Sequence, residues 1–304
     1  MAPWSGGTGV NNPGARCDCA LVLESNHCIW LPGVAGGGIS ADVVTERGQY
    51  RHPLKQIGSP NYQPYLLDFP FPVDPVVLSF IVDTWKGRSP RLTGSIVACG
   101  FDRIPLTAHN FANAFLEDTV IPYVQVDDAS HGLLRLKLVP ETLTIVRRTG
   151  IKRPEELSIA REPFLHRHYQ LELNGLDCTD VLSVDSFTVH QAIHSHPVGE
   201  LLGVQELAAG NLTFPNLSLS LANNERADGW FEWFDTFVVK SSGEGRHLKK
   251  GKLTLLSADM RRPIAHVTLD GVGICAIRED YVEAQRLAPL RVELYCDRME
   301  FGSP

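Results

Sequence analysis

The stretches Leu134-Arg135-Leu136-Lys137-Leu138 and Leu290-Arg291-Val292-Glu293-Leu294 alternate apolar and polar residues. Successive side chains of a β-strand point to opposite faces, so this alternation is typical of a strand with one face in the core and the other in water. Tyr169–Leu173 and Leu217–Leu221 repeat the pattern. We therefore expect a mainly β protein.

Only two segments have a convincing helical periodicity. The first begins with Asp74 and Pro75, favourable residues for a helix N-cap and first turn, and continues in an apolar pattern to Trp85. In the second, residues 230–238, apolar residues recur at the spacing that makes one broad apolar face of a helix. That face consists of Trp230, Phe231, Trp233, Phe234, Phe237 and Val238.

Each predicted helix precedes a turn with a glycine, a pair of strands, a long connection and a final alternating strand, so the same order occurs twice. The two alternating stretches quoted first align with each other. The other aligned positions are Gly94 with Gly251, Asp102 with Asp259, Asn113 with Gly271, and 21–25 with 171–175. A repeat of this length indicates a duplicated domain. The alternative is a loose alignment of two unrelated small β domains.

The length of 304 residues is about twice that of a usual domain and also favours two domains. Residues 147–156 are polar, charged and interrupted by a proline, as expected of an exposed linker. We expect two tandem β-barrel or β-sandwich domains, each with one packed α-helix. The expected segments are a flexible N-terminal segment 1–17, a first domain 18–150, a linker 151–163 and a second domain 164–304.

The composition excludes several classes of partner. The net charge is −7, which favours neither nucleic acid nor an anionic membrane surface. The first 16 residues lack the basic and apolar regions of a signal peptide, and no apolar stretch is long enough to span a membrane. We expect synthesis in the cytoplasm. The seven cysteines have no disulfide framework or zinc-ligand spacing, which favours reduced thiols.

The chemistry-bearing motifs are weak. Residues 34–41 contain a G-x-G-x-x-A string, but 39–46 alternates like a strand, whereas a dinucleotide loop runs directly into a helix. A flexible loop between strands is therefore the favoured interpretation. No nucleophile elbow of a serine hydrolase is present. We predict no catalytic, cofactor-binding or metal-binding residues and no cofactor.

The histidines are the one enzymatic alternative. His190, His194 and His196 lie within seven residues, and His166 and His168 within three. A zinc hydrolase also needs a general base, and Gln191 stands where the glutamate of H-E-x-x-H would be. We expect 189–203 to be a loop. A metal-dependent enzyme using the first three histidines is kept as an alternative of another class.

The order of elements resembles the tail-tube protein family of contractile phage tails and related injection systems. The resemblance covers about 18–150 and 164–302. It is carried by an x-L-E-L-N-G start, an extended loop, a strand before the helix, a Trp-containing helix, and a hairpin before an apolar strand. These features are at 169–175, 51–58, Tyr65–Phe69, 80–85 and 259–265. The chain differs from an ordinary tube subunit in carrying two such domains.

This resemblance implies a structural protein and not an enzyme. Tube domains are β-barrels that close into six-fold rings, with strands joined between neighbours. A two-domain chain would form or extend the inner tube ring of a phage-tail-like injection particle, as a tube end, adaptor or baseplate-proximal ring of six chains. Alternatively, three chains with pseudo-six-fold symmetry would form a baseplate hub that matches a trimeric spike to the hexameric tube. The implied partners are further copies and the tube, baseplate or cap proteins of the particle. A monomeric ligand-binding β module is the remaining alternative.

Overall fold

The computed structural model describes residues 18–23, 27–46, 54–100, 102–147, 151, 153–154, 163–197, 205–240, 248–279 and 288–303. The predicted segment 1–17 and most of the predicted linker lie outside these residues. The protein is mainly β, as predicted, with a nearly closed barrel-like sheet. Among the described helices, none is long and apolar enough to cross a membrane.

The first large sheet comes mainly from the N-terminal half of the chain. Its strands are β1 (Asp18–Leu23), β2 (Cys28–Leu31), β3 (Gly33–Gly36), β6 (Tyr65–Phe69), β7 (Leu92–Cys99), β8 (Pro105–Ile121), β10 (Leu134–Val139) and β11 (Thr142–Arg147). They pair in the order β2-β1-β7-β8-β10-β6-β3, and β11 pairs with β8. The alternating stretch of β10 buries its leucines between β8 and β6, which confirms the predicted strand.

The second large sheet comes mainly from the C-terminal half. Its strands are β9 (Val124–Gln125), β12 (Tyr169–Leu173), β13 (Val181–Val184), β16 (Leu217–Leu221), β17 (Lys249–Leu256), β18 (Pro263–Glu279) and β19 (Leu290–Gly302). They pair in the order β12-β17-β18-β19-β16-β13-β9. Without β9, this order matches the path β1-β7-β8-β10-β6-β3 of the first sheet, so one series of pairings occurs twice in the chain.

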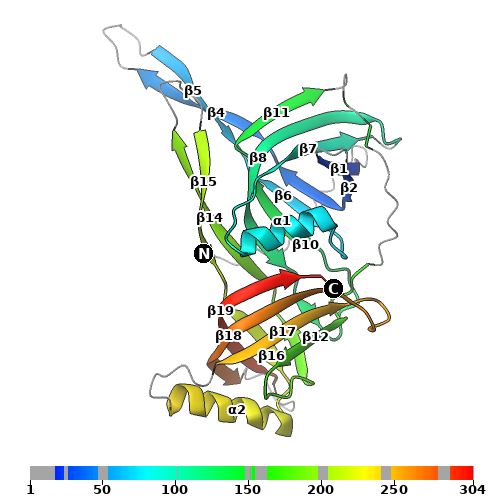
Figure 1. Cartoon of the computed structure of the whole chain (residues 1–304), viewed down its shortest axis with the longest axis vertical. Coiled ribbons are helices and arrows are strands. Elements are labelled where there is room, and N and C mark those ends of the chain that lie inside the picture. Colours follow the sequence, from blue (N-terminus) through cyan, green and yellow to red (C-terminus); the bar gives the residue numbers. More distant parts are fainter. Residues whose placement is uncertain are drawn as a thin grey trace.

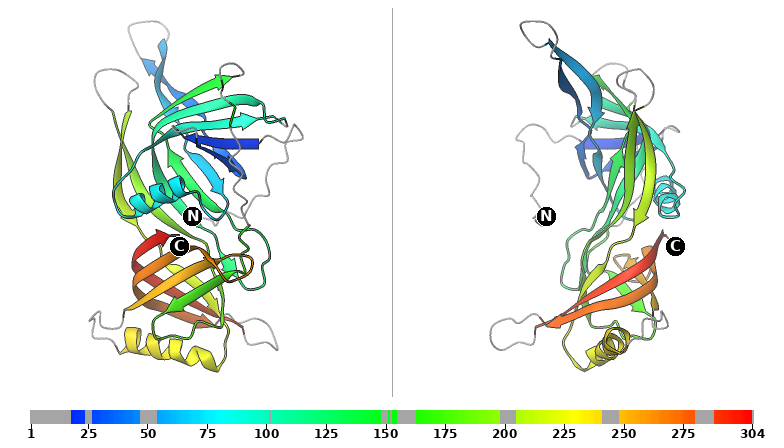
Figure 2. Two further views of the ribbon diagram at one scale, coloured as in Figure 1. Left: turned by 45° about the vertical axis from the view of Figure 1, so that its right-hand side comes forward. Right: turned by 90° about the vertical axis from the view of Figure 1, so that its left-hand side faces the viewer.

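Two hairpins complete the β structure of the described residues. Strands β4 (Ile39–Glu46) and β5 (Leu54–Tyr62) form a separate two-stranded sheet, and β14 (Phe187–Pro197) pairs with β15 (Gln205–Thr213). Figure 2 shows β4–β5 projecting at one end of the molecule. The prediction of a loop at 189–203 is wrong for its described part, because β14 is hydrogen-bonded on one edge to β15 and on the other to β8.

The glycine-rich segment 34–41 is also mostly strand and not a flexible loop. Its residues belong to β3 and β4, and the turn between them has positive φ angles at Gly36 (87°) and Gly37 (73°). Residues with a side chain rarely adopt this left-handed backbone conformation, so glycine is needed there. The glycines therefore redirect the chain into the β4–β5 hairpin.

The two predicted helices are present. Helix α1 (Pro75–Trp85) begins as expected, with the Val76 N–H donating to the Asp74 carboxylate at 3.0 Å. Helix α2 (Asp228–Phe234) follows a short 3-10 turn, η1 (Glu225–Ala227), and continues as a π-helical turn, η2 (Asp235–Val239). Figure 1 shows α1 between the two large sheets and α2 at the lower end of the molecule.

Aligned positions of the two halves share backbone geometry. Gly94 pairs with Leu23 as Gly251 pairs with Leu173, and each glycine lies opposite the end of the first strand of its half. Asn113 and Gly271 both have positive φ angles (52° and 66°) within the long strands β8 and β18.

The turns before these long strands also match. Arg103 and Met260 have positive φ angles of 57° and 59°. Each follows an aspartate whose carboxylate accepts a hydrogen bond from the backbone two residues on, and these aspartates are the aligned pair Asp102 and Asp259. The division into domains 18–150 and 164–304 remains a prediction, because strands cross between the two sheets.

Candidate assembly interface

At the surface where the two halves of the chain meet, a strand of one half pairs with the sheet of the other. Strand β7 pairs with β8 over Pro105 to Ala114 and leaves the end of that edge free, and β14 occupies it. The register sets Val189 opposite Thr119 and His190 opposite Asp118. Main-chain hydrogen bonds hold such an added strand, while buried side chains decide its register. Val189 is only 1% exposed here.

The exchange runs in the other direction as well. Strand β9, from the N-terminal half, pairs with β13 at the edge of the second sheet. Next to it, the Gln125 N–H donates to the His166 carbonyl (3.1 Å) and the Gly132 N–H to the Phe164 carbonyl (3.0 Å). Each half therefore adds a strand to the sheet of the other.

An ion pair holds β15 against the first half. Arg91 lies 3.3 Å from a carboxylate oxygen of Glu141, and both side chains reach the backbone of Leu207. The Leu207 N–H donates to Glu141 Oε1 (3.1 Å), and Arg91 Nη2 donates to the Leu207 carbonyl (3.2 Å). Glu141 also accepts from Asn113 Nδ2 at 2.7 Å. We call Arg91, Glu141 and Leu207 the Leu207 clamp.

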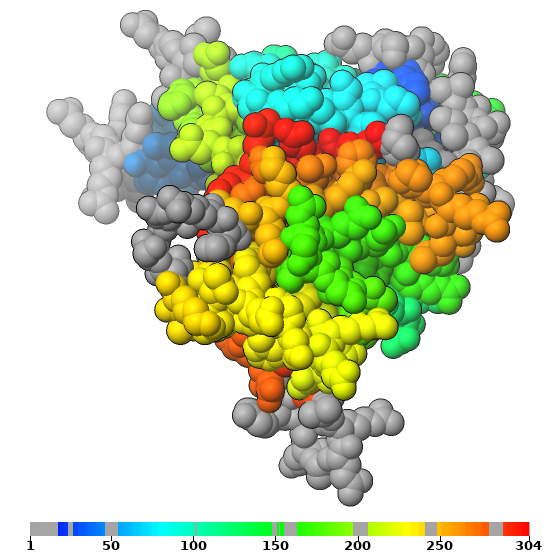
Figure 3. Space-filling model, turned by 60° about the horizontal axis from the view of Figure 1, so that its bottom comes forward, coloured from blue at the N-terminus to red at the C-terminus, as the bar shows by residue number. Residues whose placement is uncertain are grey.

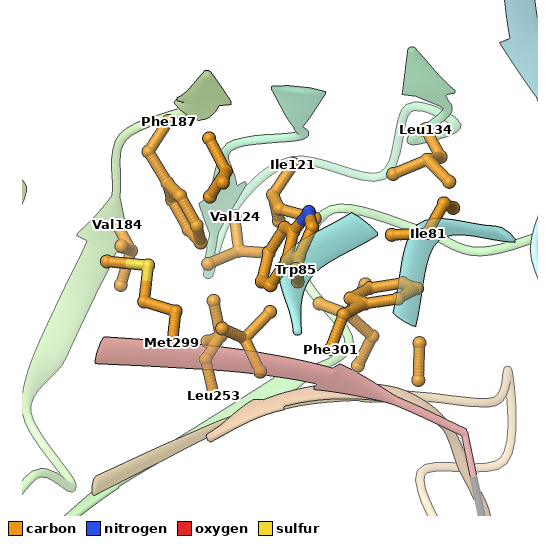
Figure 4. Close-up of a cluster of buried hydrophobic side chains, with 14 of the residues drawn as sticks. Ile81, Trp85, Ile121, Val124, Leu134, Val184, Phe187, Leu253, Met299 and Phe301 are labelled. Carbon is orange, nitrogen blue, oxygen red and sulfur yellow. The ribbon is translucent and has the colours of Figure 1, made fainter. Parts of the chain in front are cut away.

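The apolar centre of the junction is Trp85, at the end of α1. Its ring lies 5.6 Å from that of Phe301 and 6.2 Å from that of Phe214, both from the C-terminal half. Its indole N–H donates to Thr119 Oγ1 at 3.2 Å. Figure 4 shows Trp85 and Phe301 within one cluster together with Phe187 and Met299. Buried residues of both halves thus form one continuous core.

A polar cluster lies beside β9. The Tyr123 hydroxyl donates to Asp128 (2.5 Å), and its ring stacks on His166 with 3.9 Å between centroids. The bonds from Tyr123 and from the backbone and side chain of Ser130 lower the pKa of Asp128 to about 2. Burial, with the nearby Arg167 charge, lowers the pKa of His168. Asp128 is therefore charged at neutral pH, and the buried imidazole of His168 is neutral.

The structure does not gather the histidines of the enzymatic alternative into one site. His190 binds Asp118 (2.7 Å) at the strand junction, whereas His194 and His196 lie exposed farther along β14. His166 and His168 are buried in the segment before β12. Within the described parts of the chain, no group of three or more His, Cys, Asp or Glu side chains is arranged to hold a metal ion.

Sequence reasoning missed the residues that make the junction. Arg91, Glu141 and Thr119 are single polar residues in three different segments, and no motif links them. The one available signal was in 187–190, where Phe187 and Val189 alternate with polar residues as in a strand. If this alternation, which favours a strand, had been given more weight than Pro197, which favours a loop, the sequence would have predicted β14.

No protein-family model matches the chain, and no curated protein matches it. Solved structures of contractile particles are similar to about half of it. A chain of the anti-feeding prophage (AFP) baseplate is 12% identical, with 44% of this chain and 94% of that chain covered, at a TM-score of 0.35. A chain of the anti-feeding prophage cap is 12% identical (49% and 97% covered, TM-score 0.37). A chain of the PVC sheath-tube complex, an extracellular contractile injection system, is 18% identical (46% and 95% covered, TM-score 0.37).

Proposed function

We propose that this chain is a structural component of a contractile phage-tail-like particle, in which two tube-like units of one chain form part of a ring. The observation that carries the proposal is the addition of β14 to the open edge of β8. In the tail-tube family that the sequence resembles, strands join neighbouring subunits of a ring. Here the same kind of joint lies within one chain.

The two units are residues 18–150 and 164–304, and the proposal treats them as copies of one domain. The repeated series of pairings supports this, as do the positive φ angles at Asn113 and Gly271. A left-handed residue at the same place in two long strands is a specific similarity, since most residues avoid that conformation. Two unrelated β domains would have no reason to share it.

Three chains per ring fit the junction better than six. The two units are already joined edge to edge, as neighbours in a ring would be, so three chains supply six units in one layer. Six chains in two stacked rings would instead need the two units to lie along the ring axis. A three-chain ring of pseudo-six-fold symmetry suits a baseplate hub between a trimeric spike and a hexameric tube. A tube end or adaptor of six chains is the second candidate.

The role proposed is mechanical and not enzymatic. The ionisable groups of the junction are occupied in holding strands: Glu141 accepts from Leu207 and Asn113, and His190 is paired with Asp118. The chain would be made in the cytoplasm and assemble there with the tube, baseplate or cap proteins of its particle.

Native mass spectrometry and electron microscopy of the purified full chain test this function, with and without the tube subunit of the same particle. We expect rings of three chains with six similar lobes. Rings of six chains would select the second candidate. A monomer that forms no ring, either alone or with the tube subunit, would contradict the proposal. Stoichiometric zinc in the purified protein would return the histidine-based enzyme to consideration.

A further inference from the structure

We propose that neighbouring copies of this chain are joined by the β4–β5 hairpin of one copy, which adds to the free edge of β18 at residues 276–279 in the next. This inference rests on the proposed ring function and names the surface and the partner. The junction inside the chain provides the template, with β14–β15 on β8. The partner is therefore a second copy of the same chain.

The two hairpins are equivalent in detail. The β4–β5 hairpin follows β3 and precedes β6, and β3 pairs with β6. In the same way, the β14–β15 hairpin follows β13 and precedes β16, and β13 pairs with β16. Both have a register shift at the same place, between Ala41 and Val43 in β4 and between Gln191 and Ile193 in β14. Counting from these shifts, Ser40 corresponds to His190. Because bulges are retained among related domains, a bulge at a matching position indicates that the two hairpins are copies of each other.

The β4–β5 hairpin lacks the cover that its counterpart has. Ile39 is 43% exposed, Val43 62% and Ile57 80%. Val189, the counterpart of Ile39, is almost fully buried. Several exposed valines and isoleucines on a two-stranded hairpin make an aggregation-prone surface unless another chain covers it.

The matching acceptor is the last part of β18. Strand β17 pairs with β18 between Pro263 and Val272, and β19 pairs along the opposite edge as far as Glu279. In the part of the chain that the structure describes, no strand pairs with 276–279 on the β17 side. The equivalent edge of β8 is the one that β14 occupies.

The register of β18 can be transferred position by position. Strand β10 pairs with the long strand β8 as β19 pairs with the long strand β18. Each pairing has one register shift, between Lys137 and Leu138 of β10 and between Ile274 and Ala276 of β18. By this alignment, Ala276 corresponds to Asp118. Ile277 then corresponds to Thr119.

The transferred contacts are chemically compatible. Ile39 of one copy would lie opposite Ile277 of the next, which places two apolar side chains together. Ser40 would lie opposite Ala276, two small residues where the internal junction has a histidine and an aspartate. β-Branched and small pairs of this kind fit between antiparallel strands.

The Leu207 clamp also has a counterpart. Lys55 of β5 takes the place of Leu207, and Asp297 of β19 takes the place of Glu141. Both replacements are exposed in the single chain. Their opposite charges would meet across the contact between copies, which favours one register over others.

A second surface leads to the same arrangement. Within the chain, α1 is covered by Phe301 of β19, and the counterpart of Phe301 in the first half is Ile145 of β11, which is 37% exposed. In η2, the helical turn after α2, Val238 and Val239 are exposed as well. The same head-to-tail placement would bring η2 of the copy that receives the hairpin onto Ile145 of the copy that gives it. Ile145 on one copy and the two valines on the other thus both expose apolar surface that this contact would bury.

The positions of these surfaces suit a ring. Figure 1 shows β4–β5 at the upper end of the molecule and α2 at the lower end. Surfaces at opposite ends make a heterologous contact, and heterologous contacts close into rings when the rotation between copies allows it. Each copy can then give its hairpin to one neighbour and receive one from the other.

Disulfide cross-linking of the full chain tests the register. The variant Ser40→Cys/Ala276→Cys is made in a Cys275→Ser background, because Cys275 is exposed next to the site. Paired residues of antiparallel strands lie at Cα distances within reach of a disulfide. We expect mild oxidation to give covalent dimers and closed trimers on non-reducing gels. Mixing a chain that carries only the Ser40→Cys change with one that carries only Ala276→Cys, both in the Cys275→Ser background, should give dimers only.

Two matched variants serve as controls. His190→Cys/Asp118→Cys, at the internal junction, should form a disulfide within one chain and give no higher mass. Ser40→Cys/Ala258→Cys uses the same substitutions, with the second cysteine in the exposed turn before β18, and should give no cross-link. A cross-link in the second control equal to that of the test variant would overturn the proposed register.

A charge placed on the hairpin provides an independent measurement. Ile39 is exposed in the single chain, so Ile39→Asp should leave the melting temperature of the monomer unchanged. In the ring this charge would be buried opposite Ile277, and we expect association to weaken by about tenfold or more. Ring formation at wild-type concentrations by Ile39→Asp would contradict the inference.

The outcomes separate the inference from the function on which it rests. Rings that form without the Ser40–Ala276 cross-link would overturn this interface and leave the ring function standing. Absence of any oligomer, alone or with the tube subunit, would overturn the ring function itself.

Discussion

Helices α1 and α2 stand at the same place in the order of the two halves, yet α1 is covered on both sides and α2 on one. Helix α1 packs on its own sheet and also contacts β19 of the other half. Helix α2 buries Trp230 and Trp233 against its own half and leaves Phe231 exposed. In the following turn η2, Val238 and Val239 are exposed as well. Figure 3 shows α2, in yellow, on the surface of the lower end.

The difference lies in the neighbour and not in the helix. Both helices are apolar over a broad face, and both anchor an indole N–H: Trp85 donates to Thr119 and Trp230 to the Asp177 carbonyl. Only α1 has a second half of the chain above it. The apolar surface that α2 leaves exposed in a single chain is therefore suited to contact with another copy.

Removal of Trp85 should have the largest effect on this comparison. We expect Trp85→Ala to lower the free energy of unfolding by about 3–5 kcal/mol, because it opens a cavity at the centre of the junction. The matched change Val238→Ala, at the exposed end of the helical segment that follows α2, should stay within about 0.5 kcal/mol. Urea denaturation of both variants measures this. Equal losses would contradict the idea that the two helices differ in cover.

The anchor of α2 is the next test. Trp230 is fully buried, and its N–H donates to the Asp177 carbonyl at 3.0 Å. Trp230→Phe should cost about 1–3 kcal/mol, since it leaves that carbonyl without its donor and removes buried volume. Phe231→Ala, on the exposed side of the same helix, is the control and should be nearly neutral. A neutral Trp230→Phe would mean that α2 is not held by its own half.

The Leu207 clamp tests whether the cover of the first half depends on the β14–β15 hairpin. Glu141→Gln keeps the shape of the side chain but removes its charge, and we expect a loss of about 1–2 kcal/mol in urea denaturation. Arg88→Ala breaks the exposed ion pair with Asp83 and serves as the control, with an expected change of less than about 0.5 kcal/mol. If Arg88→Ala costs more than Glu141→Gln, the clamp contributes little.

The smallest effect concerns pH. Burial lowers the pKa of His168 in the folded chain, so the unfolded chain binds more protons as the pH falls below the ordinary value of about 6.5. The contribution of His168 to stability should be complete above pH 7.5 and decrease as the pH falls from 7 towards 5. In His168→Gln, urea midpoints over this range should decrease less steeply. An equal slope in both proteins would exclude His168 as a source of the pH dependence.

The sequence predicted the local elements well. The alternating stretches became β10, β12, β16 and β19, and the helix that begins at Asp74 and Pro75 was placed at its first turn. The aligned Asn113 and Gly271 share a left-handed backbone in the structure. These predictions succeeded because periodicity and capping depend on neighbours within a few residues.

The hairpin around His190 was predicted wrongly for a physical reason. The residues from His190 to His196 are mostly polar, and a polar strand without visible partners resembles a loop. Strand β14 is stabilised by main-chain bonds to Asp118 and its neighbours, some 70 residues earlier in the chain. The same long-range pairing brings Glu141 to Leu207, which no local pattern could indicate.

The sequence by itself therefore determined the β class, the two helices and the repeated order of elements. Only the tertiary structure decided which strand edges are filled. Every strand edge offers the same main-chain donors and acceptors whatever its side chains, so the choice depends on which edge lies within reach in the folded chain. That choice placed β14 on β8 and left β4–β5 and the end of β18 open within the described residues.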